Sequence, residues 1–394
     1  MSSATDVVLA AACRTPIGRF NGAFKDLKAT ELGALVLRES LARSGLPASV
    51  VDEVIMGHVV QAGAGQNSAR QAALAAGLPD SVAAFTVNKV CGSGLKAIAL
   101  AAQAIRAGDA QVVLAGGMES MTNAPYLLPK ARQGYRYGNG TLVDALFHDG
   151  LMDAYSGVAM GETGEVVAEE YHVTREAADA FSARSHALAQ KATEAGWFKK
   201  EIVPVEIVAG KTRLLVEKDE GIRADSTPGS LAKLRPAFRK EGVVTAGNSS
   251  QLSDGASAMV VTTRRLAQEH GLEVMGTFVA SATAGVAPMR VMAAPIPGIE
   301  KLLLKTRHAV DEVDLFEHNE AFATASCAVR AALKIPEDKF NVTGGAVAMG
   351  HPIGASGARL VTTLLHNLHR TGGHRGAASL CLGGGNAISA MVER

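Results

Sequence analysis

Short apolar segments alternate with helix-like patterns along most of the 394-residue chain, and this alternation limits the possible folds more than any other feature. The run "QVVLAGG" (111–117) is continuously apolar and ends in glycines, as a buried strand does. The segment before it carries Leu95, Ile98 and Ala102 at helical spacing. It ends at Gly108, a residue suited to a helix terminus. Repeated strand–helix alternation predicts a layered α/β fold, and the length allows two or more layered units.

The alternation is interrupted between about residues 119 and 243, where glycine-rich and charged segments such as "RYGNG" and "EKDEG" occur. One clear helix pattern follows Thr174, a capping residue, and runs to Gly196. We interpret this region as an insertion into the α/β fold. The segments on either side resemble each other weakly, because "VVLAGGMES" and "ASLCLGGGN" are both apolar strands that end in glycines. A duplicated unit is one explanation, although such strands are common in α/β proteins.

Charge and composition exclude several classes of partner. The formal net charge is +1, so nothing indicates binding to nucleic acid or to an anionic membrane. No apolar stretch reaches the roughly 18 residues that a membrane span requires. The segment 7–11 is interpreted as a strand rather than a signal peptide, since no positive region precedes it. The 4 cysteines are widely separated, which argues against disulfides or a zinc site and predicts a cytoplasmic protein.

Cys91 lies directly before the helix pattern that contains Leu95. At a helix N-terminus the helix dipole favours a thiolate, so we expect a lowered pKa and a nucleophilic sulfur. Gly92 and Gly94 would let a substrate carbonyl approach the backbone, where the Cys91 amide could donate to an oxyanion. The alternative is a small buried cysteine, which is the more common outcome for an isolated cysteine.

His351 lies in "GHPIGASGAR", directly before another helix pattern. Gly354 and Gly357 imply close backbone packing near this histidine, which could deprotonate a thiol. The alternative is a histidine that is hydrogen-bonded within a loop, which is the expected state for any one of the chain's 11 histidines.

Two further segments carry polar groups at the ends of strands. Cys381 ends an apolar strand in "CLGGGNA", whose glycines leave backbone amides available to a ligand. A phosphate-binding loop is the alternative, but the segment lacks the lysine and hydroxyl residues of that motif. Asn319 follows a short strand in "EHNEAFA", where its amide could position a water molecule. Together with Cys91 and His351, these residues predict a single site built at strand ends.

The chain resembles a thiolase, a coenzyme A-dependent acyltransferase, over essentially its whole length. The matching segments occur in the family's order: "RTPIGRF", "NKVCGSG", "AGGMESM", "KLRPAF", "TAGNSS", "NEAFA", "GHPIGASGAR" and "CLGGGNA". The resemblance implies two thiolase-like halves, each a mixed five-stranded sheet with helices in layers. It assigns residues 1–120 and 245–268 to the first half and 269–394 to the second. Residues 121–244 would form a loop domain that covers coenzyme A.

The resemblance also implies roles for individual residues. Cys91 would carry the acyl group, and His351 would activate it. Cys381 would act as the acid and base for the α-carbon or the coenzyme A thiol. Asn319 would fix a water molecule in one oxyanion hole, and the amides of Cys91 and Gly383 would form the other. The implied reaction is thiolytic cleavage of 3-ketoacyl-CoA to acetyl-CoA and a shortened acyl-CoA, or the reverse Claisen condensation.

Coenzyme A would be a substrate, and no metal or redox cofactor is implied. The family positions implied for coenzyme A run from the adenine and phosphate end to the pantetheine tunnel. They are Arg223, Ser230, Leu231, Phe238, Leu151, Met160, Ala246, Ser250, Leu252 and Phe322. The family also implies a homodimer or a tetramer built from two dimers.

The sequence departs from the short-chain biosynthetic pattern at four positions. Ala159 and Gln251 replace a histidine and a glycine, which leaves a preference for acetoacetyl-CoA open and gives "GNSSQLSDG" a likeness to the degradative branch. His318 replaces an aliphatic residue, and we interpret it as a structural histidine bonded to backbone. The alternative is that His318 tunes the water held by Asn319. Ala387 replaces the last glycine of the C-terminal motif.

Two other functions agree with part of this pattern. A ketoacyl synthase of the same fold pairs its cysteine with two histidines, or with histidine and asparagine, whereas here Cys381 occupies the second proton-transfer position. A non-catalytic acyl-CoA or lipid-binding relative would be expected to lack Cys91, His351 or Cys381. All three residues are present, which favours the thiolase. Chain-length preference and physiological direction stay open.

Overall fold

The computed structural model describes residues 5–210 and 212–394, which form an α/β fold with one large sheet. The strands are β1 (Val7–Arg14), β2 (Gly18–Arg19), β3 (Glu53–Gly57), β4 (Ala83–Val87), β5 (Val112–Ser120), β6 (Tyr126–Leu127), β7 (Val143–Asp144), β8 (Val205–Ala209), β9 (Thr212–Val216), β10 (Ser253–Thr263), β11 (Val274–Gly285), β12 (Leu315–His318), β13 (Arg375–Leu382) and β14 (Asn386–Glu393). The α-helices are α1 (Ala29–Ser44), α2 (Ser68–Ala75), α3 (Ser93–Ala107), α4 (Met160–Glu170), α5 (Arg175–Glu194), α6 (Pro228–Leu231), α7 (Arg264–Glu269), α8 (Pro295–Thr306), α9 (Ala323–Ala332), α10 (Ala346–Met349) and α11 (Ile353–Thr371).

The large sheet is built from two halves of similar topology. Its order is β12-β13-β14-β11-β1-β10-β5-β3-β4, and β2 pairs with β10. In the first half β3 runs parallel to β4 and β5, and the remaining pairs are antiparallel. The second half repeats this pattern with β12 parallel to β13 and antiparallel pairs beyond it. The two halves thus share one strand pattern, which favours the duplicated unit that the two glycine-ended strands left as one explanation.

The halves differ from the expected pair of five-stranded sheets in two details. Within the described part of the chain, the fifth position of the second half holds only an isolated parallel bridge between Phe316 and Phe340. In addition, β1 pairs antiparallel with β11, so the two halves form one continuous sheet. Pairing of this kind joins residues far apart in sequence, and no local pattern reports it.

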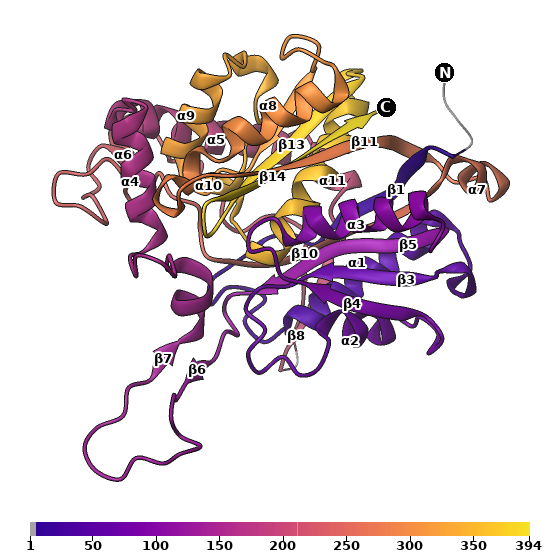
Figure 1. Cartoon of the computed structure of the whole chain (residues 1–394), viewed down its shortest axis with the longest axis horizontal. Coiled ribbons are helices and arrows are strands. Elements are labelled where there is room, and N and C mark those ends of the chain that lie inside the picture. The colour runs from indigo at the N-terminus through magenta and orange to yellow at the C-terminus, as the bar shows by residue number, and fades with distance from the viewer. Residues whose placement is uncertain (1–4, 211) are drawn as a thin grey trace.

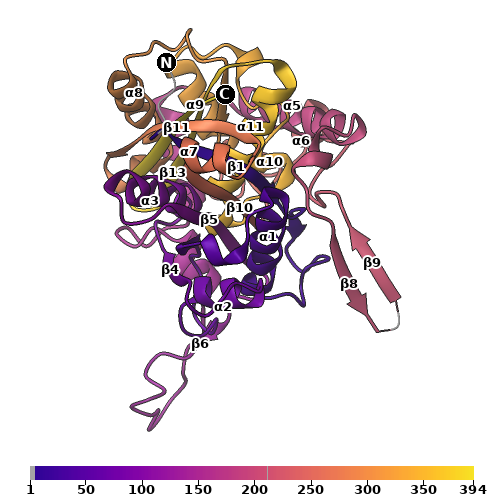
Figure 2. The ribbon, with the colours of Figure 1, turned by 90° about the vertical axis from the view of Figure 1, so that its right-hand side faces the viewer.

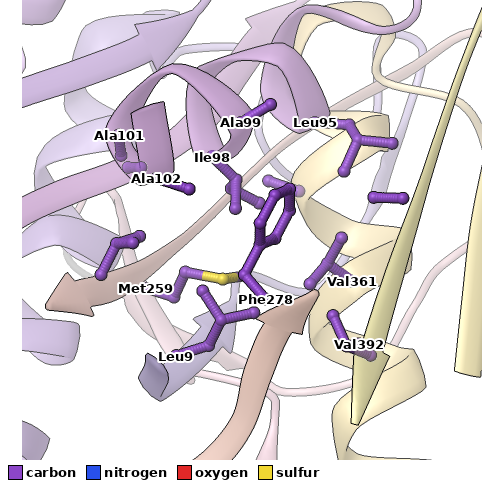
Figure 3. Packing of buried hydrophobic residues seen from close by; sticks show 14 of the residues in the cluster. Leu9, Leu95, Ile98, Ala99, Ala101, Ala102, Met259, Phe278, Val361 and Val392 are labelled. Carbon is purple, nitrogen blue, oxygen red and sulfur yellow. The ribbon is translucent and has the colours of Figure 1, made fainter. Parts of the chain in front are cut away.

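Helices α3 and α11 fill the centre of the molecule, between the two halves of the sheet (Figure 1). Along β1, Leu9 faces this central layer, whereas Val8 and Ala10 face an outer one. Figure 3 shows Phe278 of β11 at the centre, with Ile98 of α3 and Val361 of α11 beside it. Strands covered on both faces must be apolar on both, which explains the continuous apolar runs in the sequence.

Outer helices cover the remaining faces. Helices α1 and α2 pack against the first half of the sheet, and α8 and α9 pack against the second (Figure 1). The interrupted region contains α4–α6 and two small two-stranded ribbons, β6–β7 and β8–β9, which project from the body (Figure 2). The helix predicted after Thr174 is confirmed as α5, and the Thr174 hydroxyl accepts a hydrogen bond from the Ala177 amide at 3.2 Å. The three-part division of the chain stays a prediction.

Glycines allow the first turns of α3 and α11 to meet. A Cβ on Gly94 would lie 2.7 Å from the Ala358 nitrogen, and one on Gly357 would lie 2.4 Å from the Leu95 nitrogen. Both separations are shorter than real side-chain contacts, so the contact requires glycine on each helix. The close packing predicted near His351 is thereby confirmed. Among the described residues, no helix is long and apolar enough to cross a membrane.

Candidate active site

The ends of four elements bring the predicted chemical groups together. Cys91 directly precedes Gly92, the N-cap of α3, and Cys381 is the penultimate residue of β13. His351 lies between α10 and α11, and Asn319 follows β12. Cys91, His351 and Cys381 line one cavity of about 60 Å³ together with Gly383. Asn319 contacts His351, since its Nδ2 lies 3.3 Å from the His351 Nε2.

The hydrogen bonds of His351 determine which ring nitrogen can act as a base. Nδ1 lies 2.5 Å from the Ser356 Oγ, and that hydroxyl donates its hydrogen to the Pro352 carbonyl at 2.8 Å. The hydroxyl therefore accepts from Nδ1–H, and the neutral ring carries its lone pair on Nε2. Burial, with a smaller effect from Arg359, lowers the pKa of His351 to about 3. At neutral pH, His351 is thus a neutral base whose lone pair lies beside Asn319.

Both cysteines of the cavity are thiols at neutral pH. Burial raises the pKa of the Cys91 thiol well above its ordinary value, and the neighbouring Cys381 raises it further. The backbone amides of Cys91 and Gly383 oppose this effect without reversing it. Burial also raises the pKa of Cys381 to about 12, and its sulfur lies 3.6 Å from that of Met292. The expectation of a lowered pKa for Cys91 at the helix N-terminus is wrong, because burial of the sulfur raises the pKa.

Two sets of hydrogen-bonding groups could stabilise an oxyanion. The amides of Cys91 and Gly383 interact favourably with negative charge on the Cys91 sulfur. The oxyanion-hole role that the family resemblance implies for these two amides stays a prediction. On the other side of the site, Asn319 is fully buried, and its Oδ1 has no hydrogen-bond partner among the described residues. That free acceptor fits the water-positioning role that the family resemblance implies.

Gly92 and Gly94 do not provide the predicted approach for a substrate carbonyl. A Cβ on Gly92 would lie 2.4 Å from the Leu382 Cδ2, and one on Gly94 would meet α11. Both glycines therefore face the second half of the protein rather than the cavity. Their role is to let α3 start against β13 and α11.

A second cavity, of about 220 Å³, adjoins the first. The two share lining residues, among them Met160, Phe322 and His351, so they adjoin and form one path that includes Cys91. Most of the residues predicted to contact coenzyme A line this path: Leu151, Met160, Phe238, Ser250, Leu252 and Phe322. The path has the apolar walls expected around a pantetheine arm.

The other residues predicted to contact coenzyme A do not line these two cavities. Leu231 is buried next to Gly247, whereas Arg223, Ser230 and Ala246 are exposed. The Arg223 backbone amide donates to the ring of His186 at 3.1 Å. Contacts of these four residues with coenzyme A stay a prediction.

Gln251 links residues 121–244, the predicted loop domain, to the segment that leads into His351. Its Nε2 donates to the carbonyls of Gly221, Val347 and Ala348 at 2.9, 3.2 and 3.1 Å. The Gln251 carbonyl also accepts from the His351 amide at 3.1 Å. Gln251, one of the four departures from the biosynthetic pattern, therefore holds two backbone segments together by hydrogen bonds.

The remaining departures lie in different environments. Ala159 is the N-cap of α4 and lines the second cavity. Ala387 is buried and pairs with Cys381 across the β13–β14 hairpin. A side chain as small as alanine or glycine fits both positions.

His318 is a buried histidine, as expected, but its partner is not backbone. Its Nδ1 lies 3.1 Å from the Ser326 hydroxyl, and its ring stacks on Phe340 with centroids 5.7 Å apart. The interpretation as a backbone-bonded histidine is wrong in this detail. The His318 ring thus contacts Ser326 and Phe340, whereas the Asn319 side chain contacts His351.

We expect His318→Gln to weaken the acid sensitivity of folding. Burial lowers the pKa of His318 to about 3, whereas in the unfolded chain it is about 6.5. Between those pH values only the unfolded chain takes up this proton. The contribution of His318 to the free energy of unfolding is therefore complete above pH 6.5 and is lost as the pH falls toward 3. Glutamine can keep the hydrogen bond to Ser326 without titrating. Denaturant unfolding between pH 6 and 4 should show a slope smaller by about 1.4 kcal/mol per pH unit.

The matched control is His270→Gln, which removes an exposed histidine. Its unfolding free energy should keep the slope of the parent protein. If His318→Gln instead left the slope unchanged and reduced turnover at neutral pH, then His318 would act on Asn319 rather than on folding.

Several residues of the site were not found from the sequence. Ser356 orients His351, and Met292 contacts the sulfur of Cys381. Ser356 has a recognisable signal, since it lies in the first turn of the helix that follows His351. Met292 has none, because its segment belongs to a short 3₁₀ helix distant in sequence from every motif.

The chain is similar to known proteins over almost its whole length. The family models described as the N-terminal and C-terminal domains of thiolase match residues 7–265 and 272–394. A "probable acetyl-CoA acyltransferase" of Staphylococcus epidermidis is 49% identical over 389 residues, 98% of each chain. An "acetyl-CoA acetyltransferase" of Syntrophomonas wolfei is 48% identical over 392 residues, covering 98% of this chain and 99% of its own.

The crystal structure of the Bacillus anthracis acetyl-CoA acetyltransferase superposes with a TM-score of 0.97 at 44% identity, covering 98% of both chains. The similarity thus extends over both halves of the sheet and over the segment between them. With two family models spanning almost the entire chain and near-half identity to full-length relatives, the chain belongs to the thiolase family.

Proposed function

We propose that this thiolase-family acyltransferase cleaves 3-ketoacyl-CoA through an acyl group carried on Cys91, and that it can run the condensation in reverse. The observation that carries the proposal is the cavity in which Cys91, His351, Cys381 and Gly383 meet. A nucleophile, a neutral base and a second thiol that holds its proton are thus present at one place. A non-catalytic binding protein would not need all three groups, and a ketoacyl synthase does not use a second cysteine.

In the first half of the reaction, Nε2 of His351 takes the proton of Cys91. The thiolate attacks the 3-keto carbon of the substrate, and the amides of Cys91 and Gly383 stabilise the oxyanion. The bond between the α-carbon and the keto carbon then breaks, leaving the shortened acyl group on Cys91. The departing carbanion of acetyl-CoA, held as an enolate by His351 and the water on Asn319, takes the proton of Cys381.

In the second half, the Cys381 thiolate takes the proton of an incoming coenzyme A thiol. The coenzyme A thiolate attacks the acyl carbon, and the same two amides stabilise the new oxyanion. Cys91 leaves as a thiolate and recovers its proton from His351. Every group has then returned to its starting state, and no cofactor is consumed.

The assembly and the location are also proposed from the family and from the surface. We propose a homodimer or a tetramer of two dimers. The edge strand β4 has one side unpaired among the described strands and leaves the Phe85 side chain exposed, and the β6–β7 ribbon leaves Tyr126 and Leu142 exposed. Exposed apolar residues on an open edge are characteristic of a surface that is covered in an oligomer. The free cysteines support a reducing, cytoplasmic location.

A series of 3-ketoacyl-CoA substrates tests the proposed function. Branched or long apolar side chains close the cavity around Cys91, among them Val90, Met292 and Ile353. We therefore expect coenzyme A-dependent thiolysis of the four-carbon substrate, with kcat/KM falling by about tenfold or more as the chain lengthens, since each displaced side chain costs on the order of 1–3 kcal/mol. Loss of the β-ketothioester absorbance measures each rate.

Both possible results of the series are informative. No thiolysis of any member would reject the proposed reaction. Equal or faster turnover of long chains would show that the cavity around Cys91 opens on binding, and it would place the enzyme with the degradative branch.

A further inference from the structure

We propose that Glu119 is a positioning residue, which sets the place of His351 and of the cavity wall by capping the first turn of α11. This inference rests on the proposed thiolase chemistry. It concerns a carboxylate that the mechanism above does not use and that the sequence motifs mark only as part of "AGGMESM".

Glu119 is completely buried near the end of β5, and both of its oxygens accept hydrogen bonds. Oε2 accepts from the amides of Gly354 at 2.9 Å and Val59 at 3.2 Å. Oε1 accepts from the amide of Val60 at 3.3 Å and lies 3.3 Å from the His58 Nε2. A single carboxylate thus joins the loop after β3 to the start of α11.

The start of α11 depends on such an external cap. Its N-cap is Pro352, which has no side-chain hydrogen bond to offer, although the helix contains 19 residues. The first amides of a helix have no partner within the helix, and a carboxylate placed there also interacts favourably with the helix dipole. Glu119 supplies this partner at Gly354, three residues after His351.

The backbone around Gly354 leaves little room for adjustment. A Cβ at this position would lie 2.7 Å from the Met118 carbonyl and 3.0 Å from the Glu119 Oε2. The helix start is therefore held against the end of β5 at a fixed distance. A shift of Gly354 would move His351 and Ile353, which lie on the same short segment.

The same carboxylate fixes the wall of the acyl cavity. Val59, Val60 and Ile353 belong to one buried apolar cluster, and Cys91 packs at its margin. A Cβ on Gly150, which lines the cavity, would lie 3.1 Å from the Ile353 Cδ1 and 3.6 Å from the Val60 Cγ2. Through its bonds to the amides of Val60 and Gly354, Glu119 thus holds in place Val60 and Ile353, the two side chains that lie next to Gly150.

His58 holds Glu119 in this orientation. The second ring nitrogen of His58 lies 2.9 Å from the Ser68 hydroxyl, which in turn lies 3.2 Å from that of Thr86. His58 and Ser68 are both buried. Glu119 itself does not line the cavity, and its oxygens are occupied by amides and by His58. It therefore acts through His351 rather than on substrate.

The experiment compares Glu119→Gln with the parent protein. Glutamine replaces one acceptor oxygen with an NH₂ group, which faces an amide donor at the start of α11 or in the loop after β3. We expect kcat for thiolysis to fall by about 30-fold or more, because displacement of a catalytic base by a fraction of an ångström costs this much. The KM for coenzyme A should stay within about twofold, since the tunnel is lined by other residues.

A second readout reports on His351 without any substrate. Alkylation of Cys91 by iodoacetamide, followed by mass spectrometry between pH 6 and 10, measures how well His351 assists formation of the thiolate. In Glu119→Gln the alkylation should slow at every pH, because His351 is displaced. Loss of the Glu119 charge acts in the opposite direction, since that charge raises the pKa of the Cys91 thiol. This measurement separates the two proposals: a parent protein without thiolysis rejects the function, while the alkylation profiles still test the role of Glu119.

Asp52→Asn is the matched control. The Asp52 Oδ2 accepts from the amides of Gln111 and Val112 at 2.7 and 2.9 Å, at the opposite end of the strand that carries Glu119. Its kcat and alkylation profile should stay within about twofold of the parent. His58→Gln keeps the amide bonds of Glu119 and removes only its support, so its effects should have the same direction and a smaller size.

The outcomes are distinguishable. Near-normal kcat and an unchanged alkylation profile in folded Glu119→Gln would overturn the proposal, as would a change confined to the KM for coenzyme A. If Glu119→Gln does not fold, then His58→Gln decides: a lower kcat with slower alkylation supports the proposal, and parent-like behaviour rejects it.

Discussion

Cys91→Ala is expected to abolish thiolysis of acetoacetyl-CoA, lowering kcat by at least about 10⁴-fold while the protein stays folded. The other cysteine of the cavity, Cys381, has its sulfur 3.6 Å from that of Met292, and in the proposed reaction it transfers protons rather than carrying the acyl group. Folding should be affected little. Cys91 is only partly buried, and alanine fits the turn before α3, so the change in unfolding free energy should be within about 1–2 kcal/mol.

Acyl capture provides a direct test of the same prediction. Incubation with acetyl-CoA should add one acetyl group to the parent protein at Cys91 and none to Cys91→Ala, as measured by mass spectrometry. Cys327→Ala is the matched control, since Cys327 is also a partly buried free cysteine but packs on α5, away from the cavity. It should retain normal turnover. Near-normal thiolysis by Cys91→Ala would show that the proposed acyl carrier is wrong.

Local signals in the sequence predicted the elements that carry the site. The α3 segment shows helical spacing and a terminal glycine, and the structure ends this helix with Gly108 in the left-handed conformation. Thr174 predicted the start of α5 for a comparable reason, because its hydroxyl caps the helix. These features depend on residues within a few positions of each other, so a single sequence contains them.

Long-range pairing was not available from the sequence. The joining of β1 to β11 pairs Val8 with Thr277, and the isolated Phe316–Phe340 bridge stands where a fifth strand was expected. Each depends on which distant segment packs alongside. The Gln251 amide is a related case: its residue type was recognised as unusual, but its three carbonyl partners come from two distant segments.

Electrostatic properties were the least accessible part of the site. The position of Cys91 at a helix start was predicted correctly, yet its pKa is raised because the fold buries the sulfur beside Cys381. Burial is a property of the whole fold, whereas the helix dipole is a local one. For the same reason Glu119 was not recognised, since its partners Val59 and Gly354 lie far from it in sequence.

Cys381→Ala is expected to separate carbon–carbon chemistry from acyl transfer. Burial raises the pKa of Cys381 to about 12, so at neutral pH this thiol holds the proton that the carbanion of acetyl-CoA requires. Without it, cleavage of acetoacetyl-CoA should slow by about 10³-fold, within the range for loss of a general acid. Transfer of an acetyl group between coenzyme A and Cys91 needs no proton on carbon, and His351 can exchange the thiol protons. That exchange should fall by only about tenfold.

Two isotope measurements distinguish the steps. Exchange of labelled coenzyme A into acetyl-CoA follows acyl transfer, and exchange of deuterium from solvent into the acetyl methyl group follows proton transfer at carbon. Cys381→Ala should retain the first and lose the second, whereas Cys13→Ala, which removes a buried cysteine of β1, should retain both. Equal loss of both exchanges in Cys381→Ala would mean that His351 cannot replace Cys381 in proton transfer to and from the coenzyme A thiol. In that case the expected separation of carbon–carbon chemistry from acyl transfer would be wrong.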